Sequence, residues 1–177
     1  ITDSFKNWRG MQQSGGRRIK RAIYIDAQTV TFVDPEMREE FKKYHLLKDY
    51  LEMRQKEIEA YNEKHNMDTS VLINGRRMTN LGVFRKYVEC YLKNHPQINQ
   101  DMTVMVRQLG TEGRGIPLEI YCFTKTTAWL EYETIQADIF DHLYATVAFF
   151  GLDIFQEPSG RNFSNVFQSL ENNNSPE

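Results

Sequence analysis

The sequence predicts an α+β fold in which two helices cover one face of a four-stranded antiparallel sheet. Three observations support this prediction. Short runs of strand-forming residues recur along the chain, two segments carry apolar residues at helical spacing, and the two kinds of segment alternate. The predicted strands are 17–33, 102–109, 116–124 and 152–156, and the predicted helices begin near residues 80 and 126. With residues 34–79 set aside as a helical insertion, the order is β-α-β-β-α-β, the split unit of ferredoxin-like folds.

The composition fits one folded domain with a substantial insertion. Of the 177 residues, 40% are hydrophobic and 12% aromatic, which is enough for a sizeable core. The net charge of -2 argues against a general nucleic-acid binder. No apolar run approaches the ~20 residues that span a bilayer. Cys90 and Cys122 fall in a predicted helix and a predicted strand, so we expect two reduced thiols and a cytoplasmic compartment.

The first strand, 17–33, is rich in isoleucine, valine and threonine. Asp34 can cap a helix and Pro35 suits its first position, so a long helix is expected over 35–64. Its apolar stripe is narrow, which is more typical of a coiled-coil or hairpin seam than of a core helix. The stripe comprises Tyr44, Leu47, Leu51, Ile58 and Tyr61. It could pack against the chain itself, if the chain bends back, or against a neighbouring subunit.

The remaining elements have clear start and stop signals. Thr79 or Asn80 caps the next helix, and Pro96 follows its end. The glycine-rich segment 110–115 predicts a hairpin loop between two strands. The last helix begins after Thr126 or Thr127 and stops at Gly151, and the tail, 164–177, has the composition of a frayed end.

Two clusters of side chains could serve as functional sites. Asp138 and His142 are four residues apart on a predicted helix, and a metal or acid–base site is far less common there than an exposed pair. The second cluster is the basic run Arg17, Arg18, Lys20 and Arg21, which suits either nucleic acid or an anionic surface. The Lys/Arg-Gly-aromatic pattern of RNA-binding ferredoxin-like sheets is absent. We predict no catalytic, cofactor-binding or metal-binding residue.

Several short stretches together resemble the miniconductance mechanosensitive channels, which belong to the family of the small-conductance mechanosensitive channel. The resemblance runs in order over residues 1–163. It is carried by FKNWRGM at 5–11, SGGRRIKR at 14–21, NHP at 94–96, VRQL at 106–109, GIPLEIY at 115–121, QADIFDH at 136–142 and FQEPSGR at 155–161.

The resemblance implies a non-enzymatic cytoplasmic vestibule domain, cut from a longer protein whose transmembrane segments lie upstream. Residues 1–16 would be the end of an Sm-like β domain and a linker, 17–163 the ferredoxin-like domain with the insertion 34–79, and 164–177 a tail. The whole protein would sit in the bacterial inner membrane as a homo-oligomeric ring, a heptamer in this family. It would open under tension during hypo-osmotic shock and release ions and small osmolytes. No cofactor and no nucleic-acid partner is implied.

Ring assembly gives every subunit a neighbour, so we expect the apolar stripe to pack across a subunit boundary. Leu47 and Leu51 are then candidate inter-subunit residues, and Arg17, Arg18, Lys20 and Arg21 are candidates for subunit contacts or for the vestibule lining. The competing hypothesis from another class is a nucleic-acid-binding ferredoxin-like module. A third is a small hydrolase that uses Asp138 and His142.

Overall fold

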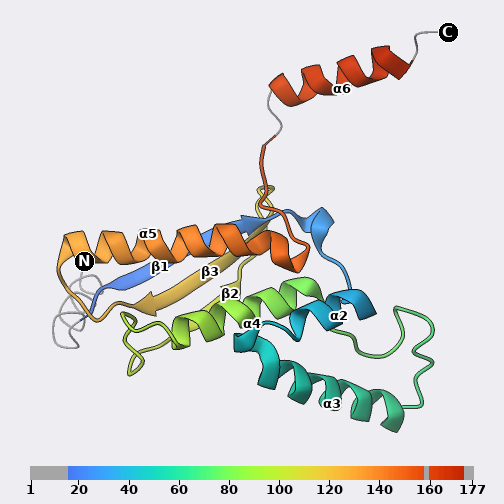
Figure 1. Ribbon diagram of the computed structural model, residues 1–177, viewed down its shortest axis with the longest axis horizontal. Coiled ribbons are helices and arrows are strands. Elements are labelled where there is room, and N and C mark those ends of the chain that lie inside the picture. Colours follow the sequence, from blue (N-terminus) through green and yellow to red (C-terminus); the bar gives the residue numbers. More distant parts are fainter. Residues whose placement is uncertain (1–15, 158–159, 174–177) are drawn as a thin grey trace.

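The computed structural model describes residues 16–157 and 160–173. The strand expected over 1–9 lies outside these residues. The centre of the fold is an antiparallel sheet with the order β1-β3-β2 (Figure 1). The strands are β1 (Arg18–Ile25), β2 (Met105–Gln108) and β3 (Ile116–Phe123). The predicted strand 116–124 is confirmed to within one residue, whereas the strand predicted over 102–109 is present at half that length.

The register of β1 against β3 places apolar side chains opposite one another. Ile19 is opposite Cys122, and Ile23 is opposite Leu118. All four are fully buried. Because side chains alternate between the two faces of a strand, one face of this sheet belongs to the core and the other faces away from it.

The chain returns to the edge of β1 at the position of the fourth predicted strand. Ile154 makes an isolated antiparallel bridge with Ile25. Two backbone hydrogen bonds flank the bridge, from Asp26 N to Asp153 O (2.8 Å) and from Phe155 N to Tyr24 O (2.8 Å). The predicted strand 152–156 is thus reduced to a single bridge beside β1.

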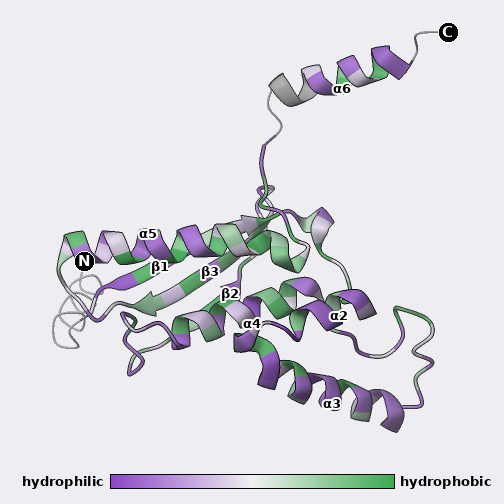
Figure 2. Ribbon diagram, in the orientation of Figure 1, coloured by the Kyte–Doolittle hydropathy of each residue, from purple (hydrophilic) through white to green (hydrophobic). Residues whose placement is uncertain are grey.

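Two helices, α4 (Asn80–Lys93) and α5 (Trp129–Thr146), supply the buried apolar residues that cover the sheet. Thr79 caps α4 as predicted, because its Oγ1 accepts from Gly82 N at 3.1 Å. The 3₁₀ turn η3 (Val147–Phe150) extends α5, and Gly151 ends it in the left-handed conformation with φ 70°. Figure 2 shows apolar colour along both helices and a largely hydrophilic α3.

The continuous helix expected over 35–64 is wrong. The insertion forms α2 (Pro35–Phe41), the 3₁₀ turn η2 (His45–Leu47) and α3 (Lys48–Lys64). Asp34 caps α2 as predicted, and its Oδ1 accepts from Met37 N at 2.8 Å. The break lets the chain turn back, so that Phe41 reaches the ring of Phe150 at 5.3 Å between centroids.

The bend also changes what the apolar stripe does. Leu47 is 0% exposed and Leu51 4% exposed within the single chain. They join the same core as the sheet and α4. The expectation that these two residues pack against a neighbouring subunit is therefore corrected: the chain packs them against itself.

Two further bounds differ from the prediction. The first strand ends at Ile25, and Asp26 caps the 3₁₀ turn η1 (Ala27–Thr29) by accepting from Gln28 N at 3.0 Å. The tail expected to be frayed is helical up to Asn173, in α6 (Gly160–Asn173). An apolar stripe of this helix is exposed, at Val166, Phe167 and Leu170. Across the described ranges, no helix has the length and apolarity needed to cross a membrane.

Candidate functional site

The basic run at the start of β1 is divided between the two faces of the sheet. Arg18 and Lys20 are exposed and alternate with the buried Ile19, so they lie on the face directed away from the core. Arg17 and Arg21 lean on α5 instead. Their guanidinium carbons lie 4.7 Å from the ring centroid of Tyr132 and 4.3 Å from that of Phe140. Cation–π contacts of this kind tie the strand to the helix.

The outward face carries aromatic side chains beside the two cations. Lys20 is opposite Tyr121, and Arg18 is opposite Phe123. The rings of Tyr121 and Phe123 meet edge to face, with centroids 5.6 Å apart. The site is therefore a partly aromatic and basic sheet face, which we call the open face.

One ion pair on the open face joins the neighbouring strands β2 and β3. Arg107 Nη2 lies 2.8 Å from Glu119 Oε1, and the Glu119 side chain is almost buried. A buried carboxylate requires such a partner, so the charge of Arg107 is neutralised by Glu119. The net positive charge of the open face then comes from Arg18 and Lys20.

The remaining predicted site residues do not join this face. Leu47, in η2, and Leu51, in α3, are buried in the core, as described above. Of the six predicted residues, Arg18 and Lys20 alone are brought together on one exposed surface.

The sequence missed an aromatic–imidazole cluster that links α4 to α5. The Tyr87 hydroxyl and His142 Nε2 are 2.7 Å apart, and the Tyr91 ring stacks on His142 at 4.1 Å and 7°. Burial lowers the pKa of His142. His142 therefore pairs with Tyr87 on another helix rather than with Asp138 four residues away, and only the packing of the two helices could have revealed this.

Neither cysteine has the environment of a reactive group. Both are free thiols, as predicted. Burial raises the pKa of Cys122 to about 12, so its nucleophilic thiolate is absent at neutral pH. Among the described residues, no group of three or more His, Cys, Asp or Glu side chains is placed to hold a metal ion.

A comparison with known families indicates the class of protein to which this fold belongs. Residues 79–154 match the family described as the mechanosensitive ion channel MscS, C-terminal. The matched segment starts at the cap of α4 and ends at the bridge to β1. The match supports an MscS-family C-terminal domain in residues 79–154, and this is a family of ion channels rather than of enzymes.

A particular relative supports the same assignment. Over 79 residues the chain is 37% identical to the low conductance mechanosensitive channel YnaI of Escherichia coli (strain K12). The alignment covers 45% of this chain and 23% of YnaI. The aligned segment thus spans less than a quarter of that channel's length. The family resemblance stated from the sequence is confirmed.

Proposed function

We propose that this chain belongs to the cytoplasmic domain of a tension-gated ion channel that releases ions and small osmolytes on hypo-osmotic shock. The observation that carries the proposal is the MscS-family match over residues 79–154, which coincides with a folded α/β unit. The similarity to YnaI, itself a mechanosensitive channel, points the same way. The pore would be formed by other parts of the protein, on the membrane side of this domain.

The proposal includes a ferredoxin-like arrangement of the α/β unit. The bridge of Ile154 to Ile25 extends the sheet beyond β1, so the edge order becomes 154, β1, β3, β2. All pairings are antiparallel, as the split β-α-β-β-α-β unit requires. The insertion 34–79 then occupies the first connection of that unit.

The whole protein would assemble as a ring, with seven subunits as the family suggests. Exposed apolar side chains on several elements support self-association, because folded monomers rarely leave so much apolar surface in water. The most exposed include Leu72 (63%), Ile73 (81%), Trp129 (62%), Leu130 (76%) and Phe149 (65%). Such a ring would lie on the cytoplasmic side of the inner membrane.

We assign Arg18 and Lys20 to the vestibule lining or to a subunit boundary. Both are exposed on the open face, beside aromatic rings and a neutralised ion pair. A positive wall would raise the local concentration of anions near the pore. Arg17 and Arg21 would hold β1 against α5 rather than meet solutes.

Survival of hypo-osmotic shock tests this proposal. The full-length protein is expressed in bacteria that lack their own mechanosensitive channels, and the cells are transferred to dilute medium. Survival should rise well above that of cells with empty vector. A matched control lacks residues 79–154 and should give no protection. Failure of the full-length protein to protect, although it reaches the membrane, would contradict the proposal.

The alternative, a nucleic-acid-binding module, rests on one observation. Tyr121 and Phe123 stand beside Arg18 and Lys20 on the open face, and RNA-binding sheets stack bases on such aromatics. The net charge of -2 opposes it. A fluorescence titration with single-stranded RNA at physiological salt should find only weak, salt-sensitive binding. Submicromolar, sequence-dependent affinity would favour the alternative.

A further inference from the structure

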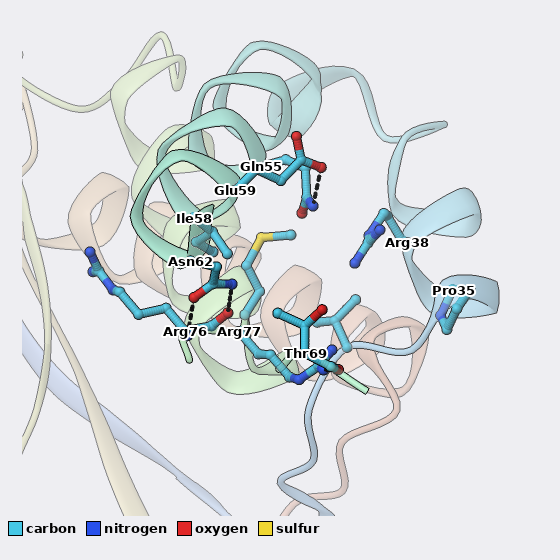
Figure 3. Close-up of a pocket in the computed structure, with 11 residues that line it drawn as sticks. Pro35, Arg38, Gln55, Ile58, Glu59, Asn62, Thr69, Arg76 and Arg77 are labelled. Atoms are coloured by element: carbon cyan, nitrogen blue, oxygen red, sulfur yellow. Dashed lines mark hydrogen bonds between the residues drawn. The ribbon is translucent and has the colours of Figure 1, made fainter. Parts of the chain in front are cut away.

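A cavity lies beside the insertion, outside the segment that matches the MscS family. It measures about 340 Å³ and lies between α2, α3 and the segment leading to α4 (Figure 3). All of its lining residues precede the segment that matches the MscS family. A second cavity of about 510 Å³ adjoins it and shares Arg38, Gln55 and Glu59 as lining residues. Whatever these cavities bind would therefore be specific to the insertion.

The cavity walls carry an excess of positive charge. Six basic and two acidic side chains line the two cavities together. Lys42 is paired with Glu39 outside the cavities, at 2.8 Å. The guanidinium of Arg76 extends away from the cavity in Figure 3 and lies over the Tyr61 ring, 5.2 Å from its centroid. The remaining basic residues still outnumber the acidic ones, so the interior favours an anion.

Arg38 is the residue that points to a ligand. Its Nε is buried and has no hydrogen-bond partner among the described residues. Figure 3 shows its guanidinium extending from α2 into the cavity, facing the side of α3 that carries Gln55 and Glu59. Because Nε itself has almost no accessible surface, a ligand would meet the outer Nη nitrogens of the guanidinium. The residue as a whole is half-buried, so this charge is partly desolvated and an anionic oxygen at the Nη nitrogens would compensate for it.

Two neighbouring groups shape the place that a ligand would take. Arg77 donates from Nε to Leu72 O (2.8 Å) and from Nη2 to Thr69 O, which fixes its guanidinium at the wall. Gln55 Nε2 donates to Glu59 Oε1 (2.8 Å), so this carboxylate is held on the α3 side. In Figure 3, Glu59 and Thr69 lie at opposite ends of the cavity, which leaves the part near Thr69 to the arginines.

We propose that this cavity binds a small oxyanion, a carboxylate or a phosphate, with Arg38 as its principal partner. The two Nη groups of arginine can donate side by side to two oxygens of either anion. The fixed charge of Arg77 adds to the attraction without needing to move. The cavity volume is at the lower end for ligand sites, so it suits a small solute rather than a polymer. The bound anion would join α2 to the segment before α4.

Isothermal titration of the full 177-residue chain tests the proposal and separates the two sources of the anion. The titrants are inorganic phosphate, succinate and, as a neutral control, glycerol. At least one oxyanion should bind saturably at low millimolar concentration or below, and glycerol should not. Arg38→Gln should weaken binding about tenfold or more, since a charged hydrogen bond is lost. Arg114→Gln removes an equal charge from the exposed hairpin loop and should leave binding unchanged.

A second measurement keeps the test valid if Arg38→Gln does not fold. In the wild-type chain, the Nε–H resonance of Arg38 is followed by NMR during the same titration. It should shift and saturate with the oxyanion, while that of Arg114 stays in place. The proposal would be overturned if neither anion binds saturably. It would also be overturned if an anion binds saturably but the Nε–H resonance of Arg38 does not shift.

Discussion

Asn80 shows how one polar side chain can join three parts of this fold. It is fully buried at the first turn of α4. Its Nδ2 donates to Thr29 O (3.0 Å) and to Phe150 O (3.1 Å), and its Oδ1 accepts from Thr31 N at 2.9 Å. The side chain thus satisfies backbone groups after β1 and at the end of η3. Sequence reasoning saw it only as a possible cap.

Replacement of Asn80 by alanine should therefore be severe. Asn80→Ala leaves three backbone groups without their partner, and each such loss costs about 1 kcal/mol or more. We expect the free energy of unfolding to fall by roughly 3 kcal/mol, as measured by urea denaturation. Asn94→Ala is the control, because the Asn94 amide bonds Cys90 O at an exposed helix end. A similar small effect at both positions would contradict the role assigned to Asn80.

The imidazole cluster predicts how stability depends on pH. Burial lowers the pKa of His142 and of His95, although Asp138 opposes the shift at His95. The unfolded chain therefore takes up protons first, near a pKa of about 6.5, and the folded state loses stability as pH falls below that value. His142→Phe keeps the stack on Tyr91 and removes one titrating group. Its unfolding free energy should vary less between pH 7 and 5 than that of wild type, and an unchanged slope would refute this cause.

At the scale of an element, α3 is held in place by its two buried residues, Leu51 and Ile58. Leu51 is 4% exposed and Met53, on the same helix, is 53% exposed. Leu51→Ala should cost about 3 kcal/mol through loss of apolar contact and a cavity, whereas Met53→Ala should cost ~0.5 kcal/mol or less. Urea denaturation of the two variants at a concentration where the wild type is monomeric measures this. If both variants lose little and equally in unfolding free energy, Leu51 would instead be assigned to a contact between subunits.

The hairpin between β2 and β3 depends on one glycine more than on its neighbours. Gly115 has φ +80°, and a Cβ there would lie 2.7 Å from Ile25 O and 2.7 Å from the Phe155 Cβ. Gly115→Ala should destabilise the chain by about 2 kcal/mol or more, from backbone strain and this crowding. A Cβ at Gly110 meets nothing within 4 Å, so Gly110→Ala is the matched control. Thermal denaturation that does not separate the two variants would contradict the close approach of 155 to β1.

The sequence predicted the elements whose signals are local. The Asp34 and Thr79 caps, the stop at Gly151 and the hairpin all follow from neighbouring residues. The break between α2 and α3 did not, because no proline or glycine interrupts 36–64 and the bend is driven by burial of Phe41 and Leu47. The same limit applies to the site. Strand alternation could have separated Arg18 from Arg21, whereas the partners of His142 and the cavity around Arg38 depend on tertiary packing.

At the scale of the whole molecule, the chain combines a segment that matches the MscS family with a preceding part that does not. The MscS-family segment provides α4, α5 and two of the three sheet strands in the described residues. β1 and the insertion precede that segment, yet they share one core with it. The open face belongs to the shared sheet, and the proposed oxyanion cavity belongs to the insertion alone.

The most direct test of the central claim is a patch-clamp recording. The full-length protein is reconstituted into liposomes, and suction is applied to an excised patch while the current is measured. The account predicts discrete currents that appear at a reproducible tension below the lytic limit and close when suction is released. It also predicts that removal of residues 79–154 abolishes these currents. Correctly inserted protein that carries no tension-dependent current up to rupture of the patch would contradict the account.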